Sequence, residues 1–218
     1  MKAKNIIALI LKDWKVEMRQ KHAIAGILLF VITTVFIIYK SFNDIGPQTW
    51  NILLWLVVLF GGINAIVKSF VQEKSDTYLY YFTLVNPLEH LIAKLIYNTA
   101  LLFALVLIII GTMTVFSGNP VKDWSLFLQA TILGTIGIGI IFTFVSSISG
   151  GAGQNTTMMS VLSLPLVLPV VLTLIKVTSV AMRLMQDSSV GKDLLILAGI
   201  DALLLGMVLL LYPMVWKG

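Results

Sequence analysis

The 218-residue sequence contains no cysteine and little charge. The lack of cysteine excludes a disulfide framework and any metal site built from thiolates. Charged residues make up only 11% of the chain and hydrophobic residues 58%, whereas a soluble domain carries about a quarter charged residues. The chain therefore has too little polar surface to cover a water-facing globule, and most of its surface must face lipid.

Catalytic motifs are also missing. The chain has no G-x-x-x-x-G-K-[ST], no H-E-x-x-H and no G-x-S-x-G. The pattern Gly134-x-x-Gly137-x-Gly139 superficially resembles a dinucleotide fingerprint, but it lies inside an apolar run with no preceding strand. Close packing between membrane helices explains these glycines better. The sequence predicts a protein that is not an enzyme, binds no cofactor directly and obtains any ATP-derived energy from another chain.

Six apolar runs each match the length of a membrane span. They are residues 23–39, 50–67, 95–116, 126–149, 161–182 and 194–216. A bilayer core takes about 20 predominantly apolar residues as helix, with a range of about 17–25. The first run could be a cleaved signal peptide, but no small-residue cleavage site follows it and five more runs do. We therefore predict an all-α fold with six transmembrane helices in a single domain, 1–218.

The basic residues predict the orientation and argue against a nucleic-acid partner, because they gather at the ends of the apolar runs. If the N-terminus is inside, ten of them lie on the cytoplasmic side: Lys2, Lys4, Lys12, Lys15, Arg19, Lys21, Lys68, Lys74, Lys94 and Lys217. The outer side then holds five: Lys40, Lys122, Lys176, Arg183 and Lys192. Short cytoplasmic loops carry the excess of Lys and Arg, so we expect both termini in the cytoplasm.

The region before the first span, 1–22, has helical periodicity. Apolar side chains recur at Ile7, Ile10, Leu11, Trp14 and Met18, while Lys12, Lys15 and Arg19 occupy the other side. This pattern is typical of an amphipathic helix that lies in the headgroup plane, with its lysines toward anionic lipid. The alternative is a simple N-terminal extension of the first span.

The longest connection is 71–94, which the topology places in the cytoplasm. Its charged residues lead into an aromatic cluster, and Asn86-Pro87 then breaks the chain and can open a new helix. The cluster contains Tyr78, Tyr80, Tyr81 and Phe82. Such tyrosines are found both at protein interfaces and in the headgroup belt, and the residues alone leave both interpretations open.

Few polar features lie within the spans. Pro165 and Pro169 should kink or locally unwind the fifth span, either to line a translocation path or simply to aid packing. Asp201 in the sixth span needs a partner or water, and Lys176 is a candidate partner unless its side chain reaches out to the interface.

Two further polar side chains, those of Asn64 and Asn98, could bond between helices. These groups are too sparse for a proton relay.

Several stretches resemble the CcmB family, the membrane subunit called haem exporter protein B of cytochrome c maturation. They are Phe70-Val71-Gln72-Glu73, Leu79-Tyr80-Tyr81, Pro87, Ala93-Lys94-Leu95-Ile96-Tyr97-Asn98 and Leu162-Ser163-Leu164-Pro165-Leu166-Val167-Leu168-Pro169. The length and the six-span layout also match, so the resemblance covers essentially the whole chain.

The resemblance implies an ABC-2-type permease of the cell inner membrane that works with a separate CcmA-like ATPase and with CcmC-like and CcmD-like subunits. It further implies that residues 71–84 form a coupling segment that docks on the ATPase. The side chains expected at this interface are Gln72, Glu73, Tyr78, Tyr80, Tyr81 and Pro87. Pro165, Pro169 and Asp201 are the candidates for a transport path.

Haem carried through the chain would need axial His, Met, Cys or Tyr ligands. The only histidines, His22 and His90, fall at cytoplasmic span ends in this topology. We therefore expect partner subunits to handle haem and the ATP-driven step to release a haem-loaded chaperone. The alternatives are an ABC-2-type permease that exports another substrate, such as a lipid or drug, and a membrane scaffold that transports nothing.

Overall fold

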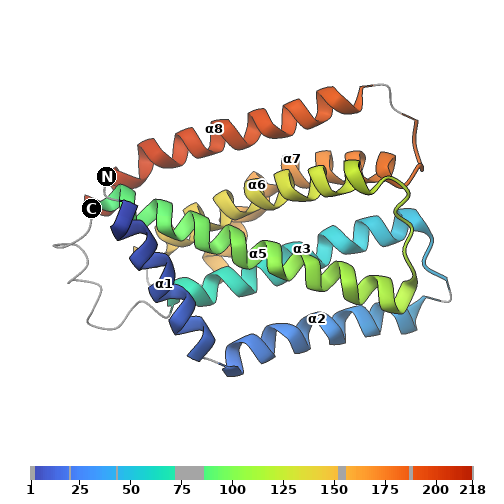
Figure 1. Cartoon of the computed structure of the whole chain (residues 1–218), viewed down its shortest axis with the longest axis horizontal. Coiled ribbons are helices and arrows are strands. Elements are labelled where there is room, and N and C mark those ends of the chain that lie inside the picture. The colour runs from blue at the N-terminus through green and yellow to red at the C-terminus, as the bar shows by residue number, and fades with distance from the viewer. Residues whose placement is uncertain are drawn as a thin grey trace.

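The computed structural model describes residues 3–19, 21–42, 44–71, 86–151, 156–186 and 189–217. These residues form helices and contain no strand, which confirms the all-α prediction for the described part of the chain (Figure 1). The helices are α1 (Ala3–Arg19), α2 (Lys21–Ser41), α3 (Pro47–Val71), α5 (Pro87–Ser117), α6 (Trp124–Gly151), α7 (Thr156–Ala181) and α8 (Val190–Lys217).

Five of these helices are long and apolar enough to cross a membrane. They are α3, α5, α6, α7 and α8. The apolar part of α2, Ala25–Ser41, is shorter and lies at the lower limit of about 17 residues for a span. Because α2 packs beside α3 and α5 in the bundle, it fits the expected first span. The count of six spans and the orientation remain predictions.

The bundle has two distinct ends (Figure 1). At one, which we call the α1 end, α1 crosses the start of α5, and α8 finishes nearby. At the other, the opposite end, lie the connections from α2 to α3, from α5 to α6 and from α7 to α8. The predicted coupling segment runs from the last residue of α3 to the start of α5, so both of its attachment points belong to the α1 end.

Helix α5 begins earlier than the apolar run had suggested. The Asn86 side chain caps the helix by accepting a hydrogen bond of 3.0 Å from the Leu88 amide, and Pro87 takes the first helical position. Proline suits this position because its missing N–H would have no partner there. Residues 87–94 of the predicted connection 71–94 are therefore the first two turns of α5, and residues 72–85 lie outside the described part of the chain.

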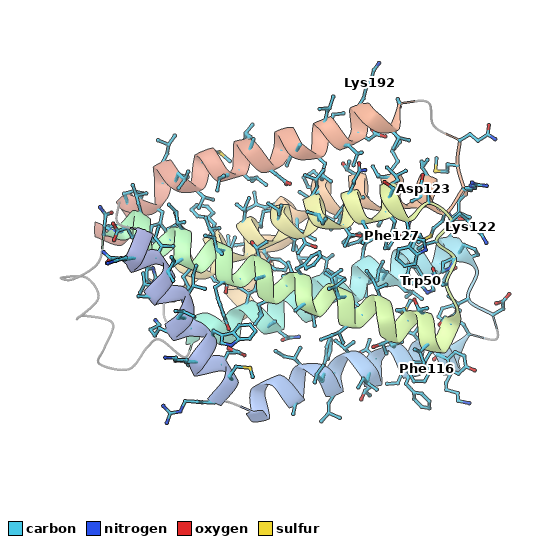
Figure 2. All side chains as sticks on the ribbon, viewed as in Figure 1. Trp50, Phe116, Lys122, Asp123, Phe127 and Lys192 are labelled. Carbon is cyan, nitrogen blue, oxygen red and sulfur yellow. The ribbon has the colours of Figure 1, made fainter. Side chains whose placement is uncertain are left out.

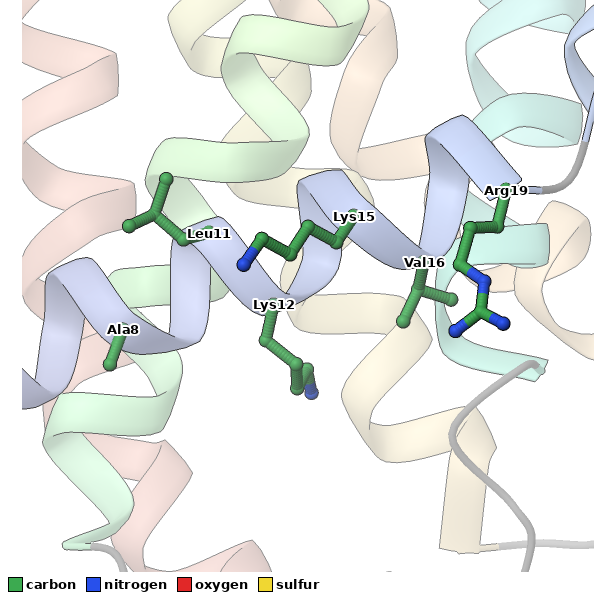
Figure 3. Close-up of a pocket in the computed structure, with 6 residues that line it drawn as sticks. All are labelled: Ala8, Leu11, Lys12, Lys15, Val16 and Arg19. Atoms are coloured by element: carbon green, nitrogen blue, oxygen red, sulfur yellow. The ribbon is translucent and has the colours of Figure 1, made fainter.

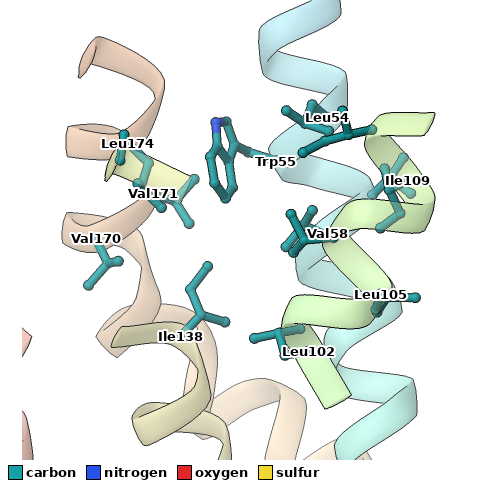
Figure 4. Close-up of a cluster of buried hydrophobic side chains, with 14 of the residues drawn as sticks. Leu54, Trp55, Val58, Leu102, Leu105, Ile109, Ile138, Val170, Val171 and Leu174 are labelled. Atoms are coloured by element: carbon teal, nitrogen blue, oxygen red, sulfur yellow. The ribbon is translucent and has the colours of Figure 1, made fainter. Parts of the chain in front are cut away.

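The larger of two apolar clusters joins α3, α5, α6 and α7 (Figure 4), and the smaller one joins α5, α6 and α8. The Trp55 side chain of α3 is fully buried and faces Val171 and Leu174 of α7. On its other side, α3 packs against Leu102 and Ile109 of α5. The core thus runs along the length of the bundle.

Three glycines of α6, those of the pattern Gly134-x-x-Gly137-x-Gly139, allow three different helices to approach. A Cβ at Gly134 would collide with Leu174 of α7, one at Gly137 with the Asp201 carboxyl group of α8, and one at Gly139 with Thr99 of α5. Small residues permit this close contact between membrane helices. The packing interpretation of the glycine pattern is confirmed, and α6 is the central helix of the bundle.

Polar side chains join α3 to α7. The Asn51 amide nitrogen donates to the Ile175 carbonyl and to the Ser179 hydroxyl, both at 2.9 Å. Its amide oxygen accepts from the Thr178 hydroxyl at 2.7 Å, and the Trp55 indole donates to that same hydroxyl at 3.2 Å. Every polar atom of the Asn51 side chain is therefore matched by a group on α7.

The two asparagines singled out from the sequence behave differently. Asn98 of α5 donates to the Thr143 hydroxyl of α6 at 3.1 Å, so the prediction of a bond between helices is confirmed. Asn64 donates to the Phe60 carbonyl of its own helix at 3.0 Å, and its side chain is exposed, so the prediction is wrong for this residue. An exposed amide near the end of a helix satisfies itself within that helix.

The opposite end is closed by aromatic packing and backbone hydrogen bonds (Figure 2). The Phe127 ring lies 6.5 Å from the Trp50 ring and 5.8 Å from the Trp124 ring, measured between centroids. The backbone amides of Lys122 and Asp123 both donate to the Ala181 carbonyl, at 3.2 and 2.9 Å. These contacts attach the α5–α6 connection to the last turn of α7.

Replacing Asn51 with Ala should destabilise the bundle, whereas replacing Asn64 with Ala should not. Hydrogen bonds between membrane helices contribute about 0.6 kcal/mol each on average, and Asn51→Ala removes three of them. We expect its free energy of unfolding in detergent to fall by about 2 kcal/mol, and that of Asn64→Ala to change by less than about 0.5 kcal/mol. Equal stability of the two variants in a denaturant titration would contradict the α3–α7 contact.

Candidate functional site

Helix α1 uses an acidic face to pack on the bundle. Leu9, Asp13 and Glu17 follow one another at intervals of four residues and therefore share one side of the helix. All three are buried, with 8%, 8% and 7% of their surfaces exposed. This side lies against the first turns of α5, where α1 crosses it (Figure 1).

A buried ion pair fixes the crossing. The Lys94 Nζ of α5 lies 3.0 Å from Asp13 Oδ2, and the Lys12 Nζ lies 3.0 Å from the other oxygen, Oδ1. The Lys94 and Asp13 side chains are only 3% and 7% exposed. Glu17 faces Tyr97 on the next turn of α5. We call Lys12, Asp13, Glu17 and Lys94 the α1–α5 charge cluster.

Further polar contacts extend from the cluster along the α1 end. The Asn5 amide donates to Glu89 Oε2 at 2.8 Å, which adds a second contact between α1 and α5. His90 Nδ1 lies 2.9 Å from the Tyr212 hydroxyl, and the two rings stack at an interplanar angle of 17°. The start of α5 is thus bonded to α1 on one side and to the end of α8 on the other.

The cluster makes the position of α1 hard to change. Breaking a buried ion pair by removing one partner costs about 3–5 kcal/mol, because the other charge is left without compensation in a poorly solvated place. Separating α1 from α5 would likewise leave the buried Lys94 charge without its partner, Asp13. We therefore expect α1 and the first turns of α5 to move together.

The sequence predicted the helix but missed the face by which it packs. Helix α1 forms over Ala3–Arg19 and runs in a different direction from α2, so it is not a simple extension of that helix. Its placement in the headgroup plane stays a prediction. The apolar periodicity does not reveal the cluster. Its signal in the sequence is Asp13 and Glu17, two acids four residues apart in a segment rich in lysine.

Most of the side chains predicted for the ATPase interface fall outside the described residues. These are Gln72, Glu73, Tyr78, Tyr80 and Tyr81. Pro87 is described and occupies the first position of α5, where it is half-buried. The role of these side chains in coupling therefore remains a prediction.

The two prolines of α7 do not interrupt their helix. Helix α7 continues through Pro165 and Pro169. Of the two alternatives that we expected, a kink or local unwinding, the unwinding is not found. The prolines lack the amides that would bond the carbonyls of Val161 and Pro165. The Thr173 hydroxyl makes a back-bond of 2.9 Å to the Pro169 carbonyl one turn earlier, a contact that Ser and Thr commonly make within helices. Both prolines are exposed on the outside of this chain, so any path that they line would have its other wall in lipid or in another subunit.

Asp201 is buried within the bundle but is not paired with Lys176. It is 6% exposed, and among the described residues neither carboxyl oxygen has a hydrogen-bond partner. Lys176 Nζ instead lies 2.7 Å from Asp193 Oδ2. Asp193 is in the first turn of α8, eight residues or about 12 Å before Asp201. The predicted Lys176–Asp201 pairing is therefore wrong, because Lys176 lies level with the first turn of α8 and not with its middle.

The comparison with known families agrees with this architecture. The family described as CcmB protein matches residues 4–214, which is nearly the whole chain. The chain belongs to the CcmB family. A comparison with curated proteins finds no match. The match includes α1, the charge cluster and all the apolar helices, so the described bundle is the CcmB domain itself.

Membership of the CcmB family defines the class of function. The protein is a multi-pass membrane protein and a transporter component, and its family implies an ABC-2-type permease of the haem-export system of cytochrome c maturation. It is not a catalytic enzyme. A permease of this kind belongs to an ABC transporter system, which implies an ATPase partner and further membrane subunits.

Changing Lys94 to Met should destabilise the CcmB chain far more than changing Lys15 to Met. Lys94→Met leaves the buried carboxylates of α1 without their partner on α5, so we expect the free energy of unfolding to fall by about 3 kcal/mol. Lys15 is an exposed lysine of α1, and its replacement should cost less than about 0.5 kcal/mol. Both values come from chemical unfolding in detergent.

The double variant Asp13→Asn/Lys94→Met separates the ion pair from other effects. If the pair is the cause, the second change should recover part of the loss, so that the two effects are not additive. Strictly additive losses would mean that Asp13 and Lys94 do not interact.

Proposed function

We propose that this CcmB chain transmits movement from a separate ATPase into the membrane during cytochrome c maturation. In this proposal the chain crosses the cell inner membrane six times and has both termini in the cytoplasm. A CcmA-like ATPase docks on the coupling segment, and CcmC-like and CcmD-like subunits complete the complex. The work of this chain is mechanical, and ATP is hydrolysed on its partner.

The α1–α5 charge cluster is the observation that carries the proposal. The predicted coupling segment enters α5 at Asn86, and Lys94 lies two turns further along the helix. A force applied to the segment would therefore reach α5 first, and the buried pair with Asp13 would carry it to α1. The His90–Tyr212 contact would carry it to α8. One entry point thus controls three helices at the α1 end.

Such an arrangement suits a two-state switch. A nucleotide can shift a conformational equilibrium only by as much as its complex prefers one state over the other. If α1, α5 and α8 move as a unit against α3, α6 and α7, closure of the ATPase would favour one arrangement of the unit and opening would favour the other. Gly137 and Gly139 of α6 provide closely packed surfaces between the two groups, because they face α8 and α5.

We further propose that partner subunits hold the haem and that the ATP-driven step releases a haem-loaded chaperone. Haem iron takes His, Met, Cys or Tyr as axial ligands, and the chain has no cysteine. The buried His90 ring is 4% exposed and bonded to Tyr212, which supports a structural role for both side chains. A porphyrin could reach this pair only by separating α5 from α8.

The docking role of the coupling segment is tested by the variant Tyr80→Ala/Tyr81→Ala. A tyrosine that is a hot spot of an interface costs about 2 kcal/mol or more when truncated, and each 1.4 kcal/mol is tenfold in affinity. With one such hot spot among the two tyrosines, we expect the affinity for the CcmA-like ATPase to fall by at least about thirtyfold in a pull-down titration. Tyr39→Ala is the matched control, because Tyr39 is an exposed tyrosine in the last turn of α2, at the opposite end of the bundle.

Undiminished ATPase binding by the Tyr80/Tyr81 variant would rule out the segment as the docking site. A second variant, Asp13→Asn, distinguishes docking from transmission. It should bind the ATPase normally but reduce the effect of this chain on the ATP hydrolysis rate, because the movement no longer passes from α5 to α1.

The proposed handling of haem is tested by its stoichiometry. We expect the chain, purified without its partners from haem-replete cells, to hold well under one haem per chain by the pyridine haemochrome assay, because the buried His90–Tyr212 pair offers no free ligand. Stoichiometric haem that survives gel filtration would show that the chain itself is a haem carrier.

A further inference from the structure

The outward side of α1 carries an apolar stripe. Ile7, Leu11, Trp14 and Met18 follow one another at intervals of four, three and four residues, which places them on one side of the helix. Each has between 53% and 57% of its surface exposed. A water-facing helix fixed to a protein by its other side would not need four large apolar side chains in this position.

A basic stripe runs beside the apolar one. At 100° per residue, Lys4, Lys15 and Arg19 lie between the apolar stripe and the edge at which Lys12 meets the bundle. Lys4, Lys15 and Arg19 are exposed, and within the described residues Lys15 and Arg19 have no ion-pair partner. The acids of α1 are turned inward to the charge cluster, so nothing on α1 neutralises this stripe.

The basic stripe borders a hollow in the surface. The hollow has a volume of about 430 Å³, and its described lining comes from α1 alone: Ala8, Leu11, Lys12, Lys15, Val16 and Arg19 (Figure 3). Lys12, Lys15 and Arg19 are its three cationic groups, and the others are apolar. A cavity of this size falls within the range of small-molecule sites, which is about 300–1,000 Å³.

We propose that this hollow binds the phosphate group of an anionic phospholipid. Lys15 and Arg19 bind the headgroup, the arginine through two parallel N–H groups and the lysine as a point charge. The apolar stripe lies against the acyl chains of the same lipid layer. The occupant is a lipid rather than free phosphate, because the cations adjoin Leu11 and Val16 and the exposed Trp14 stripe.

The charge cluster gives this site its effect on the bundle. Because Asp13 is paired with the buried Lys94, the basic stripe is held at one angle relative to α5. A lipid bound on the outer side of α1 and the protein contact on its inner side therefore act on the same short helix. Anionic lipid would anchor α1, and with it the start of α5, at the level of the headgroups.

Native mass spectrometry of the full chain in detergent tests the site. The measurement is the ratio of the association constants for phosphatidylglycerol and phosphatidylcholine. We expect wild type to prefer the anionic lipid and Lys15→Ala/Arg19→Ala to lose about thirtyfold of that preference, since each basic residue contributes about 1 kcal/mol toward an anionic lipid surface and 1.4 kcal/mol is tenfold.

The control is Lys122→Ala/Lys192→Ala, which removes two exposed cations from the opposite end (Figure 2) and should keep the wild-type preference. If the double alanine variant of α1 is unstable, Lys15→Arg/Arg19→Lys keeps both charges and should keep the preference. Inorganic phosphate at millimolar concentration should not displace the lipid.

Four results would overturn the proposal. The first is equal binding of the two lipids by wild type, and the second is an equal loss of preference in the control at the opposite end. The third is an unchanged lipid preference in Lys15→Ala/Arg19→Ala accompanied by loss of ATPase binding, which would make the basic stripe a protein interface. Displacement of the lipid by inorganic phosphate would likewise show that the site recognises phosphate alone.

Discussion

The structure depends on one buried ion pair, between Lys94 of α5 and Asp13 of α1. A lysine that is 2% exposed near the end of a membrane span cannot remain without a counter-charge, and that counter-charge comes from a helix outside the apolar bundle. The requirement for neutralisation therefore determines where α1 lies. It also joins α1 to the helix that directly follows the proposed coupling segment, so the electrostatic constraint and the mechanical connection coincide.

The remaining contacts give the bundle a firm centre and a looser periphery. In the most apolar stretch of each candidate span, 67% of the residues of α6 and 61% of those of α3 are buried, compared with 22% of those of α8. Helices α3 and α6 are therefore the interior helices, while α8 offers most of its surface to lipid or to other membrane subunits. The close helix contacts at the glycines of α6 and the hydrogen bonds from Asn51 to α7 stabilise the interior. The Asp201 side chain of α8 packs directly on Gly137 of α6.

Apolar runs predicted most of the fold, because the length of a span is set by the bilayer and is readable along the chain. They also identified the central glycines of α6 as packing residues, because small residues inside a membrane span allow neighbouring helices to approach closely. They did not mark the start of α5 at Pro87. The Asn86-Pro87 pair predicted that a helix can begin there, and the Asn86 cap confirms it. The sequence did not identify Asp193 as the partner of Lys176. Asp193 and Asp201 lie on the same helix, and the choice between them depends on how far along α8 Lys176 lies, which only the structure shows.

The candidate site was harder to predict because it depends on pairing between distant residues. Asp13 and Lys94 are each ordinary charges near a span end, and their separation in the sequence gives no sign that they meet. The tyrosines of the coupling segment were visible from composition, whereas the contact that would transmit their movement was not. Knowledge of one long-range contact, α1 on α5, would have supplied the missing step.

The most direct measurement of the proposed transmission is a pair of distances between spin labels in the complex with the ATPase. The native chain has no cysteine, so introduced cysteines can be labelled without background. The first distance joins labels at the exposed positions Lys15 of α1 and Ala104 of α5. The reference distance joins Ala104 to the exposed Leu203 of α8. If α1 and α5 form one rigid unit, the first distance stays the same with and without ATP, even in samples where the ATPase changes state. A first distance that changes with nucleotide while the reference distance stays constant would show that α1 moves independently of α5, and would contradict the role of the Lys94–Asp13 pair.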